Sequence, residues 1–119
     1  IIFYNNFNKK KIKNLRKKNI KLVKISLNSK NELNLKETLK EICKLGFSRV
    51  FLECGETLAT SFMKENLVND FNLFISKKKV GKLGSGSIKK YFNTFLKSKK
   101  SATIKVNLYG EKLISYKIK

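Results

Sequence analysis

The sequence predicts an α/β fold with a mainly parallel sheet that ends in an antiparallel hairpin. Over most of the 119 residues, short apolar runs alternate with stretches whose apolar side chains recur at helical spacing. This alternation is typical of βαβ units. Near the C-terminus the apolar period becomes two, as in strands with one solvent-facing side. Because no repeat or low-complexity linker divides the chain, we expect a single domain over residues 1–119.

The first predicted elements are two strands on either side of a weakly marked helix. Residues 1–4 are predicted to form a buried strand, and the Asn-rich segment after them supplies turn and cap residues. The Lys-rich stretch that follows has only Ile12 and Leu15 as an apolar stripe. Residues 20–25 are predicted to form the second strand, and residues 28–31 a loop.

A second helix is the best marked local element. Asn34 can cap its first turn, and Glu37 stands three residues on, which is the arrangement of a capping box. Gly46 suits a left-handed C-terminal cap. One face carries the apolar residues Leu35, Leu39, Ile42 and Cys43. Cys43 is therefore expected to be a small core residue.

The middle of the chain predicts a strand at 50–52, a helix at 56–66 and a strand at 71–76. The run 50–52 is continuously apolar, as expected for a strand covered on both faces. The helix turns inward Leu58, Ala59, Phe62 and Met63. A glycine-bearing loop at 81–87 then precedes a further helix, whose apolar face holds Ile88, Tyr91, Phe92, Phe95 and Leu96.

The last predicted element is the antiparallel hairpin. Apolar and polar residues alternate over 104–108 and again over 114–118, and the turn Tyr109-Gly110-Glu111-Lys112 lies between them. A hairpin with one wet face has this pattern.

The chain is strongly basic, with 28 Lys and Arg against 8 Asp and Glu and a formal charge of +20. Such an excess suits nucleic acid, an anionic membrane surface or phosphorylated ligands. Nearly all of it is Lys, with Arg only at positions 16 and 49, so drift toward A/T-rich codons explains it equally well.

Composition also excludes several classes of protein. No apolar stretch has the ~20 residues of a membrane span. With two Cys and no His, the chain has no ordinary zinc site, and we expect no metal. Reduced thiols and a cytoplasmic location are expected from the cysteine usage.

The strongest candidate site follows the strand at 50–52. Glu53 ends that strand, and Cys54, Gly55, Glu56, Thr57 and Leu58 lead into the next helix. Free N–H groups at a helix start suit a phosphate, and Gly55 lets an anion approach the backbone. Glu53 would instead accept hydrogen bonds from a second ligand. The alternative is that Glu53 pairs with a nearby Lys and Gly55 makes a tight turn.

A second candidate is the loop with Gly81, Gly84 and Gly86, which lacks the Gly-Lys-Ser/Thr ending of a P-loop. An ordinary loop with Ser87 as a helix cap explains it as well, and the Lys77–Lys79 run is most simply solvated. Because the chain has no His and few carboxylates, acid–base pairs are scarce. Hydride transfer from a cofactor, which mainly needs positioning, fits that composition best, and we name no catalytic residue.

A combined pattern runs through residues 45–81. It consists of Leu45-Gly46, FLECGETLA at 51–59, Phe62, LVND at 67–70 and FISKKKVG at 74–81. This stretch resembles the C-terminal part of the reductase domain of the bifunctional riboflavin-biosynthesis deaminase/reductase. The chain departs from the family pattern at Cys54, Glu56, Asn69 and Lys77. At Glu56 the family has Pro, so a negative charge stands near the expected phosphate.

The resemblance implies a dihydrofolate-reductase-like, three-layer α/β fold and NADPH as hydride donor. It implies a phosphoribosylamino-pyrimidine substrate whose ribose is reduced to a ribityl chain. Glu53 would hold the substrate, and residues 54–58 would lie along the cofactor. We expect the chain to be the C-terminal part of such a domain, catalytically incomplete alone, and to form a homodimer.

Two other hypotheses about the function are consistent with the sequence. One is a non-enzymatic basic α/β module that binds nucleic acid or other polyanions, whereas the reductase reading expects neither a nucleic-acid partner nor a membrane. The other is a related pyrimidine or pteridine reductase of the same superfamily.

Overall fold

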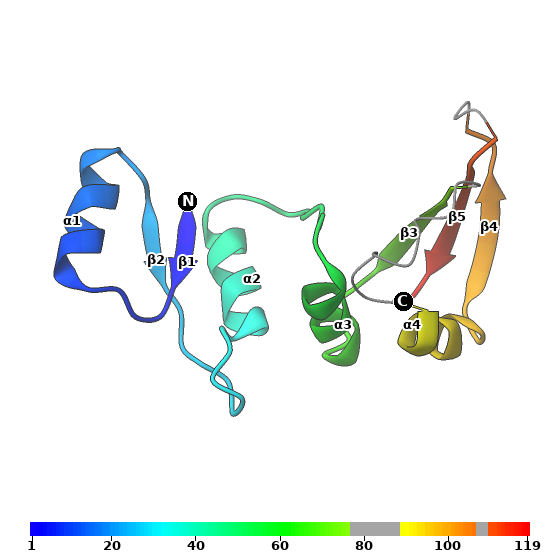
Figure 1. Cartoon of the computed structure of the whole chain (residues 1–119), viewed down its shortest axis with the longest axis horizontal. Helices are drawn as coiled ribbons and strands as arrows, with labels where there is room; N and C mark the ends of the chain where they lie inside the picture. The colour runs from blue at the N-terminus through cyan, green and yellow to red at the C-terminus, as the bar shows by residue number, and fades with distance from the viewer. Residues whose placement is uncertain (77–88, 107–109) are drawn as a thin grey trace, which may run out of the picture. The chain divides into compact units, whose positions relative to one another are not determined.

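The computed structural model describes residues 1–76, 89–106 and 110–119. The chain divides into two compact units, Ile1–Phe51 and Leu52–Lys119 (Figure 1). No helix in the described ranges is both long and apolar enough to cross a membrane. The loop with Gly81, Gly84 and Gly86 and the Lys77–Lys79 run lie outside the described residues.

The first unit contains β1 (Ile2–Tyr4), α1 (Lys9–Lys17), β2 (Leu22–Lys24) and α2 (Leu35–Lys44). β1 and β2 pair in parallel, with Phe3 opposite Val23. In Figure 1 the two strands lie between α1 and α2. All four elements were predicted from the sequence, and the parallel pairing confirms that part of the expected sheet.

α1 forms although none of its side chains is buried. The Asn8 side chain accepts a hydrogen bond from the Lys11 N–H at 2.7 Å, which satisfies one of the N–H groups left free at a helix start. Arg16 and Lys17 lie in the last turn, where the helix dipole favours cations. The Asn8 cap and the two cations of the last turn therefore favour α1, which has no wide apolar face.

α2 has the predicted Asn34 cap, which accepts from the Glu37 N–H at 3.0 Å. The capping box does not close, however, because the Glu37 carboxylate binds Ser26 instead. It accepts from the Ser26 N–H at 2.9 Å and also from the Ser26 hydroxyl. These hydrogen bonds lower the pKa of Glu37. Glu37 therefore ties the segment after β2 to the first turn of α2.

The end of α2 confirms one prediction and corrects another. Gly46 has φ +93°, the left-handed conformation expected of a C-terminal cap. Cys43 is exposed, so its predicted place in the core is wrong. Successive residues of a helix are about 100° apart around its axis, so Cys43 lies to one side of the half-buried Ile42 and faces solvent.

The second unit contains α3 (Glu56–Lys64), β3 (Asp70–Ile75), α4 (Lys89–Leu96), β4 (Lys100–Ile104) and β5 (Lys112–Lys117). The strand order is β3-β5-β4, with β5 antiparallel to both neighbours. β3 and β4 therefore run in the same direction on either side of the central strand. The antiparallel pairing of β4 and β5 confirms the predicted C-terminal hairpin, although β4 begins at Lys100, earlier than predicted. Residues 107–109, in the predicted first strand and turn, lie outside the described residues.

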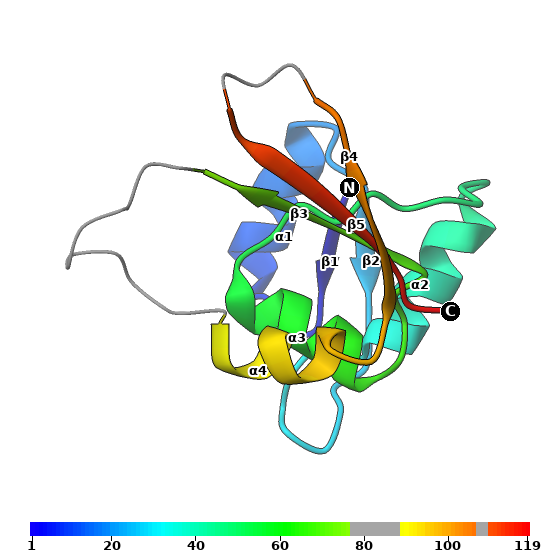
Figure 2. The ribbon, with the colours of Figure 1, turned by 90° about the vertical axis from the view of Figure 1, so that its right-hand side faces the viewer.

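The core of this unit lies between the two helices and one face of the sheet (Figure 2). Its buried members are Met63, Phe92, Leu96 and Ile118, and Ala59, Val68, Phe71, Phe95 and Tyr116 pack against them. The inward face predicted for α3 is confirmed at Phe62 and Met63 but wrong at Leu58, which is 41% exposed. Leu58 lies about 100° around the helix from Ala59.

The predicted strand at 50–52 does not form. Phe51 is 85% exposed and Val50 48%, although this run has the apolar pattern of a doubly covered strand. A buried strand needs partners for its N–H and C=O groups along both edges, and the described residues supply none here. The single, mostly parallel sheet is therefore seen only in part, as one parallel pair and a separate antiparallel sheet.

Candidate functional site

The segment 53–55 leads into α3 and is exposed to solvent. Glu53, Cys54 and Gly55 are all exposed, and Gly55 is the N-cap of the helix. The first helical hydrogen bond runs from the Ala59 N–H to the Gly55 carbonyl at 3.1 Å. The N–H groups of residues 55–58 are therefore left without helical partners, as at any helix start. Together with the helix dipole they favour an anion, phosphate above all.

The backbone at Gly55 does not require glycine. Its φ is −74°, which any residue adopts, and an added Cβ would meet no atom within 4 Å. The alternative that Gly55 serves a tight turn is therefore not supported. An absent side chain instead leaves open space beside the free N–H groups, where a ligand can approach the backbone.

The Glu53 carboxylate is free within the described part of the chain. The ion pairs found there join Lys44 to Glu41 and Lys117 to Asp70, and no hydrogen bond holds Glu53. The alternative of a local Glu53–Lys pair is not seen. An exposed carboxylate keeps its full capacity to accept hydrogen bonds from hydroxyl or amide groups of a ligand.

The remaining site residues lie on the first turn of α3. Glu56 is half-buried and acidic, which suits the helix start but opposes a bound anion. Thr57 and Leu58 are exposed, and the Thr57 carbonyl accepts a hydrogen bond from the Ser61 hydroxyl at 3.0 Å. The hydroxyl of Thr57 is left available to a ligand.

The site is one contiguous segment, so its residues are neighbours by sequence rather than by folding. The described residues bring no cation to it and no second acid that would form an acid–base pair with Glu53. The segment can therefore bind and orient a phosphorylated ligand and a hydroxylated one. Positioning of ligands is therefore the contribution that this segment can make to a reaction.

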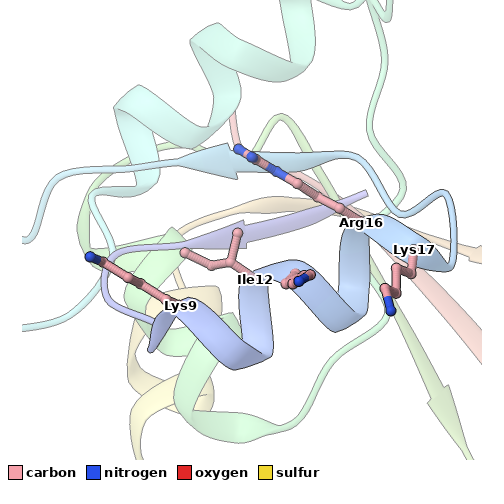
Figure 3. Close-up of a pocket in the computed structure, with 5 residues that line it drawn as sticks. Lys9, Ile12, Arg16 and Lys17 are labelled. Carbon is pink, nitrogen blue, oxygen red and sulfur yellow. The ribbon is translucent and has the colours of Figure 1, made fainter.

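Another set of polar residues was not singled out from the sequence. On α1, four cations and one apolar residue line a hollow of about 540 Å³ (Figure 3): Lys9, Ile12, Lys13, Arg16 and Lys17. The signal was present as Lys residues spaced four apart. The net charge of the whole chain does not show this spacing, because it carries no information on which residues share a face.

Comparison with protein families identifies the chain. The family model described as the RibD C-terminal domain matches residues 1–109, which span both units. A search of curated proteins gave no match. The resemblance read from residues 45–81 is thus confirmed over nearly the whole length of the chain. The chain belongs to the RibD C-terminal domain family, and this membership implies a reductase-type function in riboflavin biosynthesis.

Proposed function

We propose that this chain is part of an NADPH-dependent reductase of riboflavin biosynthesis. Its substrate would be a 5-amino-6-(5-phosphoribosylamino)uracil-type compound, whose ribosyl group is reduced to a ribityl chain. Family membership over residues 1–109 is the observation that carries this proposal. The scarcity of acid–base groups at the candidate site agrees with it, since hydride transfer depends mainly on how two ligands are placed.

The residues of the site fit the two ligands in different ways. The free N–H groups of residues 55–58 and the open space at Gly55 suit a phosphate-bearing cofactor along the segment from Cys54 to Leu58. NADPH supplies the hydride when bound. The Glu53 carboxylate, which is exposed and free in the described part of the chain, suits the hydroxyl groups of the substrate. Glu56 is the one group that works against the cofactor.

Two Gly→Ala variants test the cofactor site. Gly55→Ala keeps an ordinary φ and adds a Cβ in open space, so we expect little change in folding stability. If the cofactor lies against the backbone there, that Cβ weakens NADPH binding by about tenfold, or ~1.4 kcal/mol. Gly46→Ala is the matched control. Its φ of +93° strains any L residue, so stability falls while NADPH affinity stays unchanged.

The measurement is a fluorescence titration of NADPH with each protein, alongside urea denaturation. Binding is the readout because it does not depend on a complete catalytic site. A chain that does not bind NADPH, or a Gly55→Ala variant that binds as tightly as the parent, would contradict the assigned cofactor site.

A homodimer is also part of the proposal. It rests on the family resemblance, and sedimentation of the purified chain tests it. A sedimenting mass near 13.8 kDa at all concentrations would mean a monomer.

A further inference from the structure

The basic face of α1 has a regular geometry. Lys9, Lys13 and Lys17 are spaced four residues apart, so they form one row along the helix, about 6 Å between successive positions. Ile12 and Arg16 form the neighbouring row. In Figure 3, Lys9, Ile12 and Arg16 extend from one side of the helix, and Lys17 leaves near its C-terminal end. The four cations are exposed and Ile12 is half-buried.

These cations have no acidic partners in the described part of the chain. Residues 1–31 carry nine Lys and Arg16 but no Asp or Glu. The ion pairs formed by the described residues lie elsewhere, on α2 and in the second unit. Like charges four apart on a helix destabilise it by a few tenths of a kcal/mol per pair, about 0.2–0.5. An anion bound along this face would relieve that repulsion.

The shape of the hollow indicates what kind of anion fits. Small-molecule sites are clefts that enclose most of their ligand, whereas this hollow is lined by residues of α1. A hollow lined by one helix alone does not enclose a small ligand, whereas a polyanion can run along it. The cations follow one another along a single helix, which suits the successive phosphates of one strand.

The lining residues also indicate whether this face recognises the sequence of a bound nucleic acid. They comprise four cations and one Ile, with no side chain that accepts a hydrogen bond. Contacts from Lys and Arg to phosphate oxygens position a nucleic acid but carry no sequence information. We propose that the α1 face binds the phosphate backbone of single-stranded nucleic acid without sequence preference. This binding does not depend on the proposed reductase function. It differs from the expectation that a reductase of this family has no nucleic-acid partner.

Two triple variants of the full chain test the proposal. Lys9→Gln/Lys13→Gln/Lys17→Gln removes three charges from α1, and Gln preserves helix propensity. The matched control is Lys36→Gln/Lys40→Gln/Lys44→Gln. It removes three exposed Lys with the same spacing from α2, where Glu37 and Glu41 are interleaved. Both variants have the same net charge, so a difference between them reports the α1 face rather than the charge of the whole chain.

The measurement is fluorescence anisotropy of a labelled thymidine oligonucleotide over a series of salt concentrations. We expect the α1 variant to bind at least about tenfold more weakly, with a salt slope smaller by about 2, from three lost phosphate contacts. The α2 variant should change affinity by less than about threefold. Lys9→Arg/Lys13→Arg/Lys17→Arg keeps the charges and should retain binding, and circular dichroism confirms that each variant folds.

Equal weakening by the two Gln variants would overturn the proposal, because binding would then follow net charge alone. So would the absence of binding at low salt, or a strong preference for thymidine over adenosine oligonucleotides. Displacement of the oligonucleotide by micromolar NADPH would also overturn it, since the face would then be a small-ligand site.

Discussion

Phe71 of β3 stacks on Phe92 of α4, with ring centroids 5.1 Å apart and ring planes inclined by 20°. Phe92 is 3% exposed and lies in the buried cluster of the second unit, whereas Phe71 packs at its edge. Tyr116, directly opposite Phe71 on β5, extends the aromatic contact across the sheet, with a centroid distance of 6.2 Å. The stack thus joins helix α4 to two strands of the sheet.

Truncating this stack should destabilise the second unit. We expect Phe71→Ala to lower the free energy of unfolding by about 2–3 kcal/mol, through lost apolar burial and the cavity left behind. Phe74→Ala is the matched control on the same strand. Phe74 is 58% exposed, so we expect a change within about 0.5 kcal/mol. Urea denaturation measures the free energy of unfolding of both variants. Equal decreases at the two positions would show that the aromatic stack does not contribute more to stability than an exposed Phe.

The Ser26–Glu37 contact should make stability depend on acid pH. The pKa of Glu37 is lowered in the folded chain from its ordinary 4.5 by the two Ser26 hydrogen bonds. Its contribution to stability is therefore present above pH 4.5 and is lost as the pH falls through the lower, folded pKa. Glu37→Gln removes this contribution, so its melting temperature should fall less than that of the parent between about pH 6 and pH 3.

Two serine variants sharpen the same experiment. Ser26→Ala removes the hydroxyl donor and keeps the backbone donor, so we expect a pH dependence between those of the parent and Glu37→Gln. Ser29→Ala changes an exposed serine close by and should behave as the parent. An unchanged acid dependence in Glu37→Gln would show that other carboxyl groups govern the transition.

The two cysteines offer an internal comparison for the cofactor site. Cys43 and Cys54 are both free and exposed, so both should react with iodoacetamide. Under the proposed function, NADPH covers the segment after Glu53 and slows alkylation of Cys54, while Cys43 on α2 reacts at the same rate. Peptide mass spectrometry over time measures the two rates separately. Equal protection of both thiols would indicate a general effect of NADPH on the protein.

Removing the charge of Glu56 should strengthen cofactor binding. A carboxylate at the first position of α3 repels a phosphate at the same helix start. We expect Glu56→Gln to tighten NADPH binding by about twofold to fivefold at low salt, with the gain shrinking as salt screens the charge. Glu65→Gln, at the other end of α3, removes an equal charge and should have no such effect. Equal gains from both variants would mean that net charge, not position, controls affinity.

Local signals in the sequence predicted most of the elements correctly. The Asn34 cap and the left-handed Gly46 depend on residues close in the chain, so both ends of α2 were readable in advance. The second partner of Glu37 was not, because Ser26 lies eleven residues away and competes with the capping box. The helix α1 was only weakly marked, yet Asn8 caps it as its position allows.

The candidate site was also predicted in part from the sequence and in part only from the structure. Residues 53–58 are contiguous, so the sequence was sufficient to find the segment, while the exposure of Glu53 and the open space at Gly55 are results of the structure. The spacing of four between the lysines of α1 was the signal in the sequence for their common face, while the hollow that they line is a result of the structure.

The sequence by itself determined the order and type of most elements, the helix caps and the family of the chain. Only the tertiary structure decided which strands pair and which apolar side chains are buried. Phe71 meets Tyr116 across β3 and β5, whereas the equally apolar Phe51 stays 85% exposed. The physical reason is that the apolar pattern shows only which side chains gain free energy when they are buried. Whether a side chain is buried depends on contacts with residues from distant parts of the chain.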